Sequence, residues 1–520
     1  ILCLNSNHIF NFFGGMEVNA VNRQRTWFNG VGMQYEMGML PAYEYQYFKQ
    51  GSEENAQYYT VERTRQREVS FFGTATYSYQ GKYTLNGTLR YEGSNKLGKS
   101  RSARWLPTWN LSAAWNAHEE KFWQPLLNYV SNMTLKASYS LTADRGPASA
   151  SNSRAIIQSY NTWRPFTSIK ESGLRVVNIE NQELTYEKKH ELNIGAEIGF
   201  LNNRINLAVD WYKRNNYDLI GIINTKGTGG QLTKLANVAS MKSHGIEFTL
   251  STQNIKKKDF SWNTDFIFSN TKNEVTDLQS NSSVIEMISG SGFALEGYPV
   301  RSLFSMDFRG LNESGYPTFI NEDGNLTVSN INFQERIKKD HLIYEGPTDP
   351  TITGSFGNSF KYKNFLLNLF ITYSFGNVIR LDPVFHNQYS DLDAMPREFI
   401  NRWTKGGDEK YTDIPVIADK RANQQDPYLS YAYNAYNYST ARIAKGDFIR
   451  MKEISLTYNF PKKLIVRAGV SDLSLKLQAT NAFLIYSDKK LNGQDPEFFN
   501  TGGVASPVPQ QFTLTLRLGI

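Results

Sequence analysis

Apolar and polar residues alternate with a period of two in one segment after another of this chain. From Leu192 to Phe200 every second residue is apolar, and the residues between them are polar or glycine. After Asn202-Asn203 the alternation resumes and runs from Ile205 to Tyr212. This period predicts a β-hairpin whose strands each have one apolar face and one polar face.

The same alternation recurs along most of the chain, in Tyr83–Tyr91, Leu135–Leu141, Phe365–Phe375, Ile454–Phe460, Leu473–Leu477 and Phe512–Ile520. With weaker segments included, it predicts roughly fourteen to sixteen strands, which exceeds the usual size of an open sheet. A barrel accommodates so many strands because it grows by the addition of hairpins. We therefore predict an all-β chain that forms a transmembrane antiparallel β-barrel.

The side of the sheet that faces lipid does not follow from alternation alone, since a soluble β-sandwich would bury its apolar face. Two features favour a membrane barrel, in which the apolar face contacts lipid. Many predicted strands reach about ten residues, the length that crosses a bilayer at a tilt. Aromatic residues lie near predicted strand ends, as the belts of a membrane barrel do: Tyr83, Tyr91, Trp109, Trp115, Tyr373 and Phe375.

A third feature is the unequal length of the connections. Short links at 80–82, 202–203 and 361–364 alternate with long polar ones at 142–187, 270–352 and 376–445. Outer-membrane barrels have short periplasmic turns and long extracellular loops. The connections therefore favour the barrel over the soluble β-protein.

Composition excludes several other classes of protein. The mean hydropathy is −0.48, and the sequence lacks a run of about 18 apolar residues, which a membrane-spanning helix needs. The single cysteine, Cys3, permits no internal disulfide. The net charge of +7 is spread along the chain, and the one short basic run, Lys256–Lys258, fits a solvated turn better than nucleic-acid binding.

Several segments resemble the SusC/RagA family of TonB-dependent outer-membrane transporters, in an order that the chain preserves. They are Leu184–Lys188, Asn193–Gly195, Phe200–Ile205, Asp210–Lys213, Asn237–Met241, Gly245–Phe248, Glu296–Val300, Gly310–Asn312, Gly446–Lys452, Tyr458–Pro461, Asn481–Phe483 and Gly493–Glu497. The resemblance begins near Phe12–Glu17 and is clearest beyond residue 70. One departure is the last residue, which is usually aromatic in the family and is Ile520 here.

The resemblance implies a barrel of about 22 strands in the full protein. Residues 1–520 would form the C-terminal portion of that barrel, and we expect the signal peptide, N-terminal domain, plug and first strands to lie outside them. It also implies active import of an oligosaccharide or a peptide through the outer membrane of a Gram-negative bacterium. A SusD-like surface lipoprotein would cap the loops, TonB would supply energy through the N-terminal part, and two transporter–lid pairs could form a dimer. A passive porin or a structural outer-membrane surface protein is the alternative.

The sequence carries no recognisable catalytic motif, so we predict that the protein is not an enzyme and has no cofactor. Its six histidines show neither an HExxH motif nor the spacing of a helical metal site. A nucleophile elbow and a phosphate-binding loop are also absent from the sequence. Asn321–Gly324 could bind calcium, but a plain turn is preferred because the ligand ladder of an EF-hand is missing.

Aromatic residues in the long connections are the candidates for contacts with a ligand or a lid. We single out seven of them: Tyr428, Tyr431, Tyr433, Tyr436, Tyr438, Trp163 and Trp403. Such side chains can stack on sugar rings or pack against a protein partner. The alternative is that they cover other loops or lie at the lipid headgroups.

Overall fold

The computed structural model describes residues 2–5, 7–28, 33–34, 40–41, 46, 49, 59–146, 154–162, 171–228, 230–280, 282–335, 338–383, 385, 397–465, 469–498 and 509–519. Contacts between Cα atoms divide the chain into two compact units. Unit 1 comprises Ile1–Ala113, Ser138–Leu192 and Asn215–Ser240. Unit 2 comprises Ala114–Ala137, Asn193–Arg214 and Met241–Ile520.

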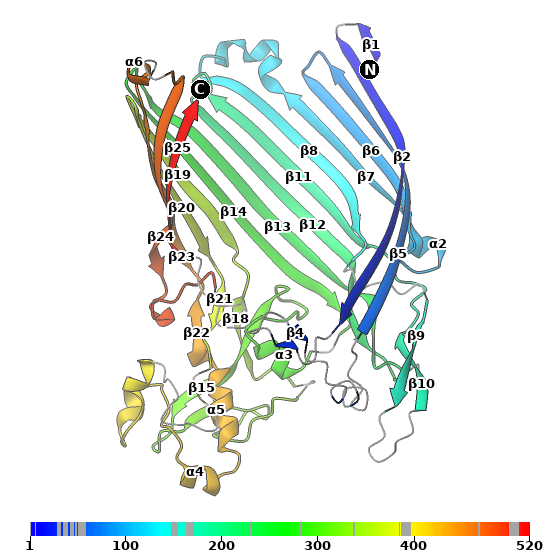
Figure 1. Cartoon of the computed structure of the whole chain (residues 1–520), viewed down its shortest axis with the longest axis vertical. Coiled ribbons are helices and arrows are strands. Elements are labelled where there is room, and N and C mark those ends of the chain that lie inside the picture. The colour runs from blue at the N-terminus through cyan, green and yellow to red at the C-terminus, as the bar shows by residue number, and fades with distance from the viewer. Residues whose placement is uncertain are drawn as a thin grey trace. The chain divides into compact units, whose positions relative to one another are not determined.

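One large sheet dominates the described residues (Figure 1). Its fifteen strands, in order of hydrogen-bonded neighbours, are β1 (Leu2–Asn5), β2 (His8–Phe28), β5 (Tyr59–Tyr79), β6 (Tyr83–Ser94), β7 (Trp105–Asn116), β8 (Val130–Asp144), β11 (Glu187–Phe200), β12 (Ile205–Asn224), β13 (Thr233–Lys256), β14 (Phe260–Leu278), β19 (Ile352–Tyr362), β20 (Phe365–Phe375), β23 (Phe448–Asn459), β24 (Asp472–Ser487) and β25 (Gln511–Gly519). This number confirms the prediction of fourteen to sixteen strands.

Smaller elements occupy the connections. Three two-stranded sheets are β3 (Met33–Gln34) with β4 (Leu40–Pro41), β9 (Ile156–Thr162) with β10 (Glu171–Asn178), and β21 (Val378–Arg380) with β22 (Ile443–Lys445). Among the described residues the helices are α2 (Arg101–Arg104), α3 (Val284–Ile288), α4 (Lys420–Gln425), α5 (Leu429–Asn437) and α6 (Lys462–Ile465). Short 3-10 helices are η2 (Ala117–Glu119), η3 (Lys121–Leu126), η4 (Arg397–Asn401), η5 (Asp408–Lys410), η6 (Thr440–Arg442) and η8 (Lys489–Leu491).

Tight turns join the strands at one end of the sheet, as the short links predicted. Gln80 and Gly81 both have positive φ angles, 53° and 70°, between β5 and β6. A turn whose two central residues both have positive φ has a backbone twist that matches the right-handed twist of the strands it connects. Asn202 and Asn203 also have positive φ between β11 and β12, and asparagine tolerates this conformation better than most residues.

The strands of unit 1 expose their apolar residues on one face. On β6, Leu85 is 49% exposed and Leu89 is 57% exposed, whereas Thr84, Asn86 and Thr88 lie on the opposite face. Apolar side chains that alternate outward in this way are expected where lipid, and not water, covers the sheet. None of the described helices is long and apolar enough to span a membrane.

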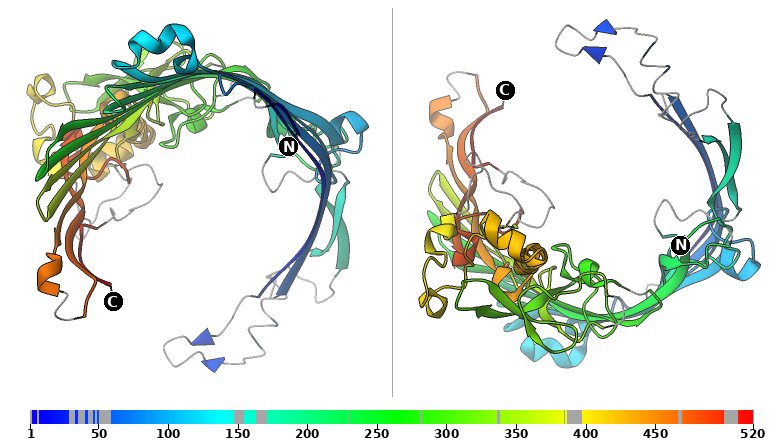
Figure 2. Two further views of the ribbon diagram at one scale, coloured as in Figure 1. Left: turned by 90° about the horizontal axis from the view of Figure 1, so that it is seen from above. Right: turned by 90° about the horizontal axis from the view of Figure 1, so that it is seen from below.

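A hydrophobic core lies within the long connections of unit 2. We call the segments that form it, 282–347 and 397–442, the loop domain. Its sheet has the order β17 (Leu326–Thr327), β16 (Pro317–Ile320), β15 (Ser302–Leu311) and β18 (Leu342–Pro347). Helix α5 packs against this sheet through buried residues such as Tyr436, beside Phe319 and Met306. Both views of Figure 2 show the orange helices of this region against the green strands of the same unit. The long loops therefore fold into a compact body with a core of its own.

Candidate functional site

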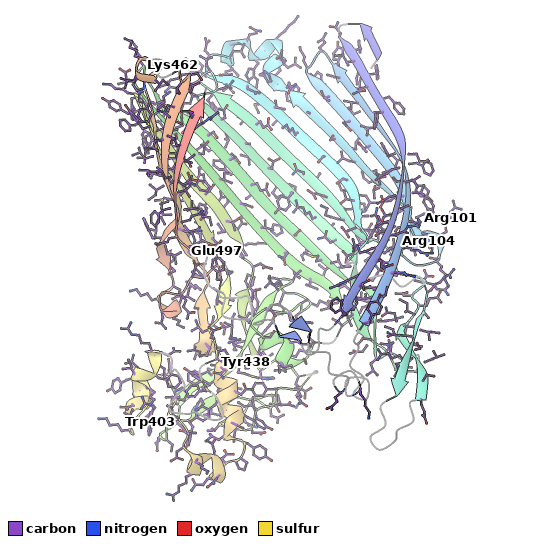
Figure 3. All side chains as sticks on the ribbon, viewed as in Figure 1. Arg101, Arg104, Trp403, Tyr438, Lys462 and Glu497 are labelled. Carbon is purple, nitrogen blue, oxygen red and sulfur yellow. The ribbon has the colours of Figure 1, made fainter. Side chains whose placement is uncertain are left out.

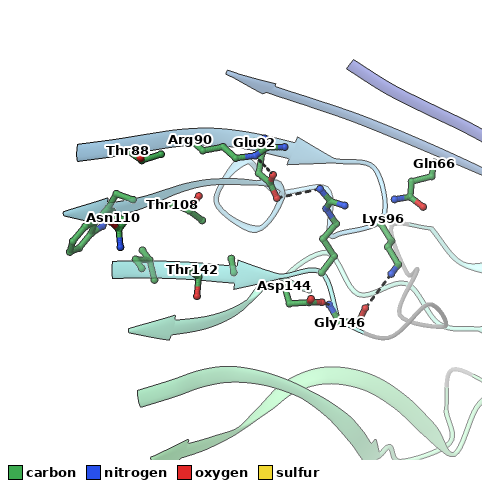
Figure 4. Close-up of a pocket in the computed structure, with 14 residues that line it drawn as sticks. Gln66, Thr88, Arg90, Glu92, Lys96, Thr108, Asn110, Thr142, Asp144 and Gly146 are labelled. Atoms are coloured by element: carbon green, nitrogen blue, oxygen red, sulfur yellow. Dashed lines mark hydrogen bonds and ion pairs between the residues drawn. The ribbon is translucent and has the colours of Figure 1, made fainter. Parts of the chain in front are cut away.

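A polar cavity of about 720 Å³ lies on the polar face of the sheet in unit 1 (Figure 4). Strand alternation brings Thr88, Arg90 and Glu92 of β6 to this face, since residues two apart on a strand point the same way. Thr108 and Asn110 of β7 and Thr142 and Asp144 of β8 complete much of the wall. The lining is therefore rich in hydroxyl, amide and charged groups.

Arg90 pairs with two carboxylates, Glu17 on β2 and Glu92 on its own strand, β6. Its Nη2 lies 2.9 Å from Oε2 of Glu17 on β2, and its Nε lies 2.8 Å from Oε2 of Glu92. The pair with Glu92 is the less exposed of the two, because the Glu92 side chain is only 13% exposed. Arg90 thus neutralises charge that the fold has removed from water.

Arg145 joins the same network from the residue that follows β8. Its Nη1 lies 2.7 Å from Oε1 of Glu68, and its Nη2 lies 3.5 Å from Oε1 of Glu92. Glu68 is buried, and its other oxygen accepts a hydrogen bond of 3.2 Å from Asn19. A buried carboxylate is costly without a partner, and Arg145 supplies that partner. The ion pairs of Arg145 also fix the start of the long connection after β8 to β5 and β6.

The backbone beside this network is also held in place. Lys96 Nζ donates to the carbonyl of Gly146 at 3.3 Å, and the amide of Gly146 donates to Asp144 at 2.8 Å (Figure 4).

Tyr186, which precedes β11, is fully buried, and burial raises the pKa of its hydroxyl to about 12. The tyrosine is therefore neutral at physiological pH.

This arrangement suits binding rather than catalysis. Arg90 and Arg145 pair with Glu92, and Lys96 and Asp144 are hydrogen-bonded to the backbone of Gly146, so the wall presents charges held by partners together with hydroxyl groups. No nucleophile with an adjacent base is found among the described lining residues. Arg90 lies within the predicted alternating segment Tyr83–Tyr91, but the sequence did not reveal the network, because Glu17, Glu68 and Arg145 meet it from distant segments.

The tyrosines predicted as contact residues divide into two groups. Tyr433 and Tyr436 are buried in the core of the loop domain, and the Tyr433 hydroxyl donates to the carbonyl of Val416 at 2.7 Å. Tyr428 and Tyr431 are exposed, with ring centroids 5.8 Å apart. Tyr438 is half-buried and packs edge-on against Phe333 (Figure 3). The structure therefore does not bring the five to one surface.

The segment that holds them is helical, whereas sequence analysis treated it as an irregular loop. Leu429, Ala432, Tyr433 and Tyr436 follow helical spacing and are all buried. This pattern is the signal that could have identified the helix. The exposed pair then occupies positions at the start of the helix.

Trp403, labelled in Figure 3, lies in the loop domain, whereas Trp163 lies outside the described residues. The Trp403 indole donates to Glu409 at 3.1 Å and packs against Gly315. Gly315 has a φ of 78°, and a Cβ there would lie 2.4 Å from the indole ring. Trp403 is therefore held in a defined position. A contact with ligand or lid stays a prediction for all seven aromatic residues.

The buried side chain of Arg380 joins three segments of unit 2 through hydrogen bonds to their backbone carbonyls. Arg380 is 6% exposed and donates to the carbonyls of Phe304, Ile288 and Ser439 at 2.6, 3.3 and 2.8 Å. Burial lowers the pKa of its guanidinium to about 10, so it stays charged at neutral pH. Nothing in the local sequence marks this residue, because its partners come from three distant segments.

The described residues contain no group of three potential ligands that could hold a metal ion. Asn321–Gly324 forms the turn between β16 and β17. The Asn321 side chain accepts from the amides of Asp323 and Asn325 at 3.1 and 2.9 Å, which is the geometry of an Asx turn. The preferred interpretation as a turn is confirmed.

A family model described as TonB dependent receptor-like, beta-barrel matches residues 5–473. The chain belongs to this family. TonB-dependent receptor SusC of Bacteroides thetaiotaomicron is 26% identical over 482 residues, which cover 89% of this chain and 44% of SusC. TonB-dependent receptor P3 of Formosa agariphila is 25% identical over 460 residues, which cover 82% of this chain and 42% of the relative.

Solved structures of the RagAB peptide transporter have the same fold. One aligns with 99% of this chain and 54% of its own at a TM-score of 0.77, with 20% identity. The RagAB importer in its open-open state aligns with the whole chain and 53% of its own at a TM-score of 0.78, with 21% identity. The chain spans about half the length of the curated relatives it matches.

Membership of the TonB-dependent receptor family confirms the outer-membrane β-barrel and the SusC/RagA resemblance. The apolar face of the strands therefore contacts lipid, and the polar face with its charge network lines the interior. In such barrels the long connections are extracellular. The loop domain and the cavity wall near Arg145 thus belong to the extracellular half.

We expect Arg145→Gln to destabilise the protein by roughly 1–3 kcal/mol, because Glu68 and Glu92 lose a cation in a partly buried setting. Chemical denaturation of the full protein in detergent micelles measures this change. Glu68→Gln in the Arg145→Gln background should recover part of the loss. Lys136→Gln is the matched control, because its pair with Glu197 is exposed and should contribute under about 1 kcal/mol. Equal losses in the two single variants would contradict the network.

The loop domain should lose stability as pH falls below about 6.5. Burial lowers the pKa of His341, and both ring nitrogens lack partners among the described residues. A folded-state pKa below the unfolded value favours the neutral ring, so its contribution is complete above 6.5 and is lost as pH falls toward the folded pKa.

Hydrogen exchange of β18 at pH 7.5 and 5.5 measures this effect in the parent and in His341→Phe. Burial raises the pKa of Glu345, which acts in the opposite direction. The difference between the two proteins therefore isolates His341. Identical pH dependence in both would show that His341 does not contribute.

Proposed function

We propose that the protein imports a nutrient through the outer membrane, with a SusD-like surface lipoprotein as its lid and TonB as its source of energy. The substrate would be an oligosaccharide or a peptide. The observation that carries this proposal is the alignment of the entire chain with the RagAB peptide importer, whose solved states include closed-closed and open-open forms. Similarity to SusC supports the same interpretation.

The loop domain supports a lid-dependent importer. A partner that docks repeatedly on extracellular loops benefits from a preformed surface, since ordering flexible loops costs free energy on binding. Here the buried core of α5, β15 and β16 supplies that order. Tyr428, Tyr431 and Trp403 are predicted contact residues at or near its surface, and we propose them for the lid or the ligand. Trp163, which lies outside the described residues, stays a further candidate.

The interior wall supports passage of a polar nutrient. Thr88, Thr108, Asn110 and Thr142 offer hydroxyl and amide groups, and the charges of Arg90 and Glu92 are paired. A wall of this kind can hydrogen-bond hydroxyl or peptide groups without attracting one sign of charge strongly. It does not distinguish an oligosaccharide from a peptide.

A passive porin or a structural surface protein remains the alternative. Energy dependence separates these functions, because import through a porin follows the concentration gradient. The folded loop domain favours the importer, since a passive pore has no need of a docking platform.

Deletion of the gene should abolish growth on one polymer-derived nutrient and leave growth on glucose unchanged. The measurement is growth on a panel of oligosaccharides and peptides, with reintroduction of the gene as control. Deletion of tonB should reproduce the defect on that same nutrient. Unchanged growth on every nutrient would contradict import, and a defect that does not depend on TonB would favour the porin.

A further inference from the structure

Strand β5 carries three arginines in succession on its outward face. Arg63, Arg65 and Arg67 alternate along the strand and share the face of Val69 and Phe71. Phe71 is 49% exposed on the apolar band of the sheet. The outward face of this strand therefore changes within two residues from apolar to strongly basic.

The position of this change matches the margin of the membrane. Val69 lies ten residue steps along β5 from Tyr79, which is at the periplasmic turn. At about 3.4 Å per residue and a tilt of about 40°, they span about 26 Å, close to the apolar band of about 25 Å in outer-membrane barrels. Arg67 is thus the first outward residue beyond the band on the extracellular side.

Aromatic residues mark the same margin on the neighbouring strands. Tyr91 pairs with Phe71, and Gly93 pairs with Val69. The ring of Trp105 stacks on Tyr91 with centroids 5.2 Å apart. Aromatic side chains in outer-membrane barrels gather at the level of the headgroups, so the arginines begin at headgroup level.

The positive charge of these arginines is not balanced within the described residues. Arg67 donates to the Val21 carbonyl and the Asn22 side chain at 3.2 and 2.7 Å, and Arg63 donates to the Gln24 side chain at 3.0 Å. All of these acceptors are neutral. Within the described chain no carboxylate forms an ion pair with any of the three, because Glu62 and Glu68 point to the opposite face.

Two further arginines lie on the same side of the strands. Arg101 and Arg104, both labelled in Figure 3, belong to α2, which lies outside the blue strands of unit 1 in both views of Figure 2. Arg104 donates to the carbonyl of Gly98 at 3.2 Å, again a neutral acceptor. We call Arg63, Arg65, Arg67, Arg101 and Arg104 the outer arginine patch.

We propose that the outer arginine patch binds the phosphate groups of lipopolysaccharide in the outer leaflet of the membrane. Guanidinium groups match phosphate geometry and donate two hydrogen bonds at once. Basic clusters at a membrane margin attract anionic headgroups, and lipopolysaccharide presents phosphorylated sugars at this level. The site is distinct from the transport path, because it faces lipid and not the interior.

The test compares two charge-matched double variants of the full protein. Arg63→Gln with Arg65→Gln removes two outward charges and keeps Arg67, whose bonds hold the backbone. Arg23→Gln with Arg25→Gln removes two charges from the opposite face of the same hairpin, where Arg23 pairs with Thr64 and Arg25 with Glu62. Each protein is reconstituted in phosphatidylcholine nanodiscs and titrated with bisphosphorylated lipid A, dephosphorylated lipid A or inorganic phosphate.

The parent and the Arg23/Arg25 variant should bind bisphosphorylated lipid A at least tenfold more tightly than the Arg63/Arg65 variant. Binding of bisphosphorylated lipid A by the parent should weaken as the salt concentration rises, and the parent should bind dephosphorylated lipid A far more weakly. This comparison uses the parent alone, so it tests the proposal even where a variant fails to fold. Equal binding of both lipids by the parent would overturn the proposal, as would unaltered binding in the Arg63/Arg65 variant. Complete competition by millimolar inorganic phosphate would show a free-phosphate site and would also overturn it.

Discussion

Backbone hydrogen bonding within the membrane is the constraint on which the rest of this structure depends. Lipid offers no partner to an N–H or C=O group, so strands that cross it must bond to neighbouring strands. Once the backbone is committed to a sheet, consecutive side chains must point to opposite faces. The period-two pattern from Leu192 to Phe200 is the direct result, and both the lipid-facing surface and the charged interior wall follow from it.

The two faces of the sheet meet different electrostatic environments. On the outward face of β6, Leu85 and Leu89 meet lipid and carry no polar group. On the inward face, Arg90 and Glu92 each have a group of opposite charge within hydrogen-bonding distance. Beyond the apolar band the outward face of β5 becomes basic, where headgroups replace hydrocarbon. The two neighbouring strands β5 and β6 thus meet three environments, and only the side-chain sequence distinguishes them.

The sequence predicted the strands well because alternation is a local property. The turns at Gln80-Gly81 and Asn202-Asn203 were found for the same reason, since turn chemistry depends on adjacent residues. The charge network was not predicted, because Arg145 meets Glu68 and Glu92 only after distant strands pair. Arg380 likewise has no local signal. Helix α5 was not predicted although its apolar spacing was present, because Tyr433 and Tyr436 suit a contact surface as well as a core.

Accessibility measured residue by residue along β6 tests the central claim most directly. Single cysteines at positions 84 to 89 of the full protein, with Cys3 replaced by serine, can carry spin labels in proteoliposomes. Collision with oxygen reports lipid, and collision with a water-soluble nickel complex reports water. Positions 85, 87 and 89 should favour oxygen, whereas 84, 86 and 88 should favour nickel. A profile without a period of two, or one with the opposite phase, would contradict the assignment of the apolar face to lipid.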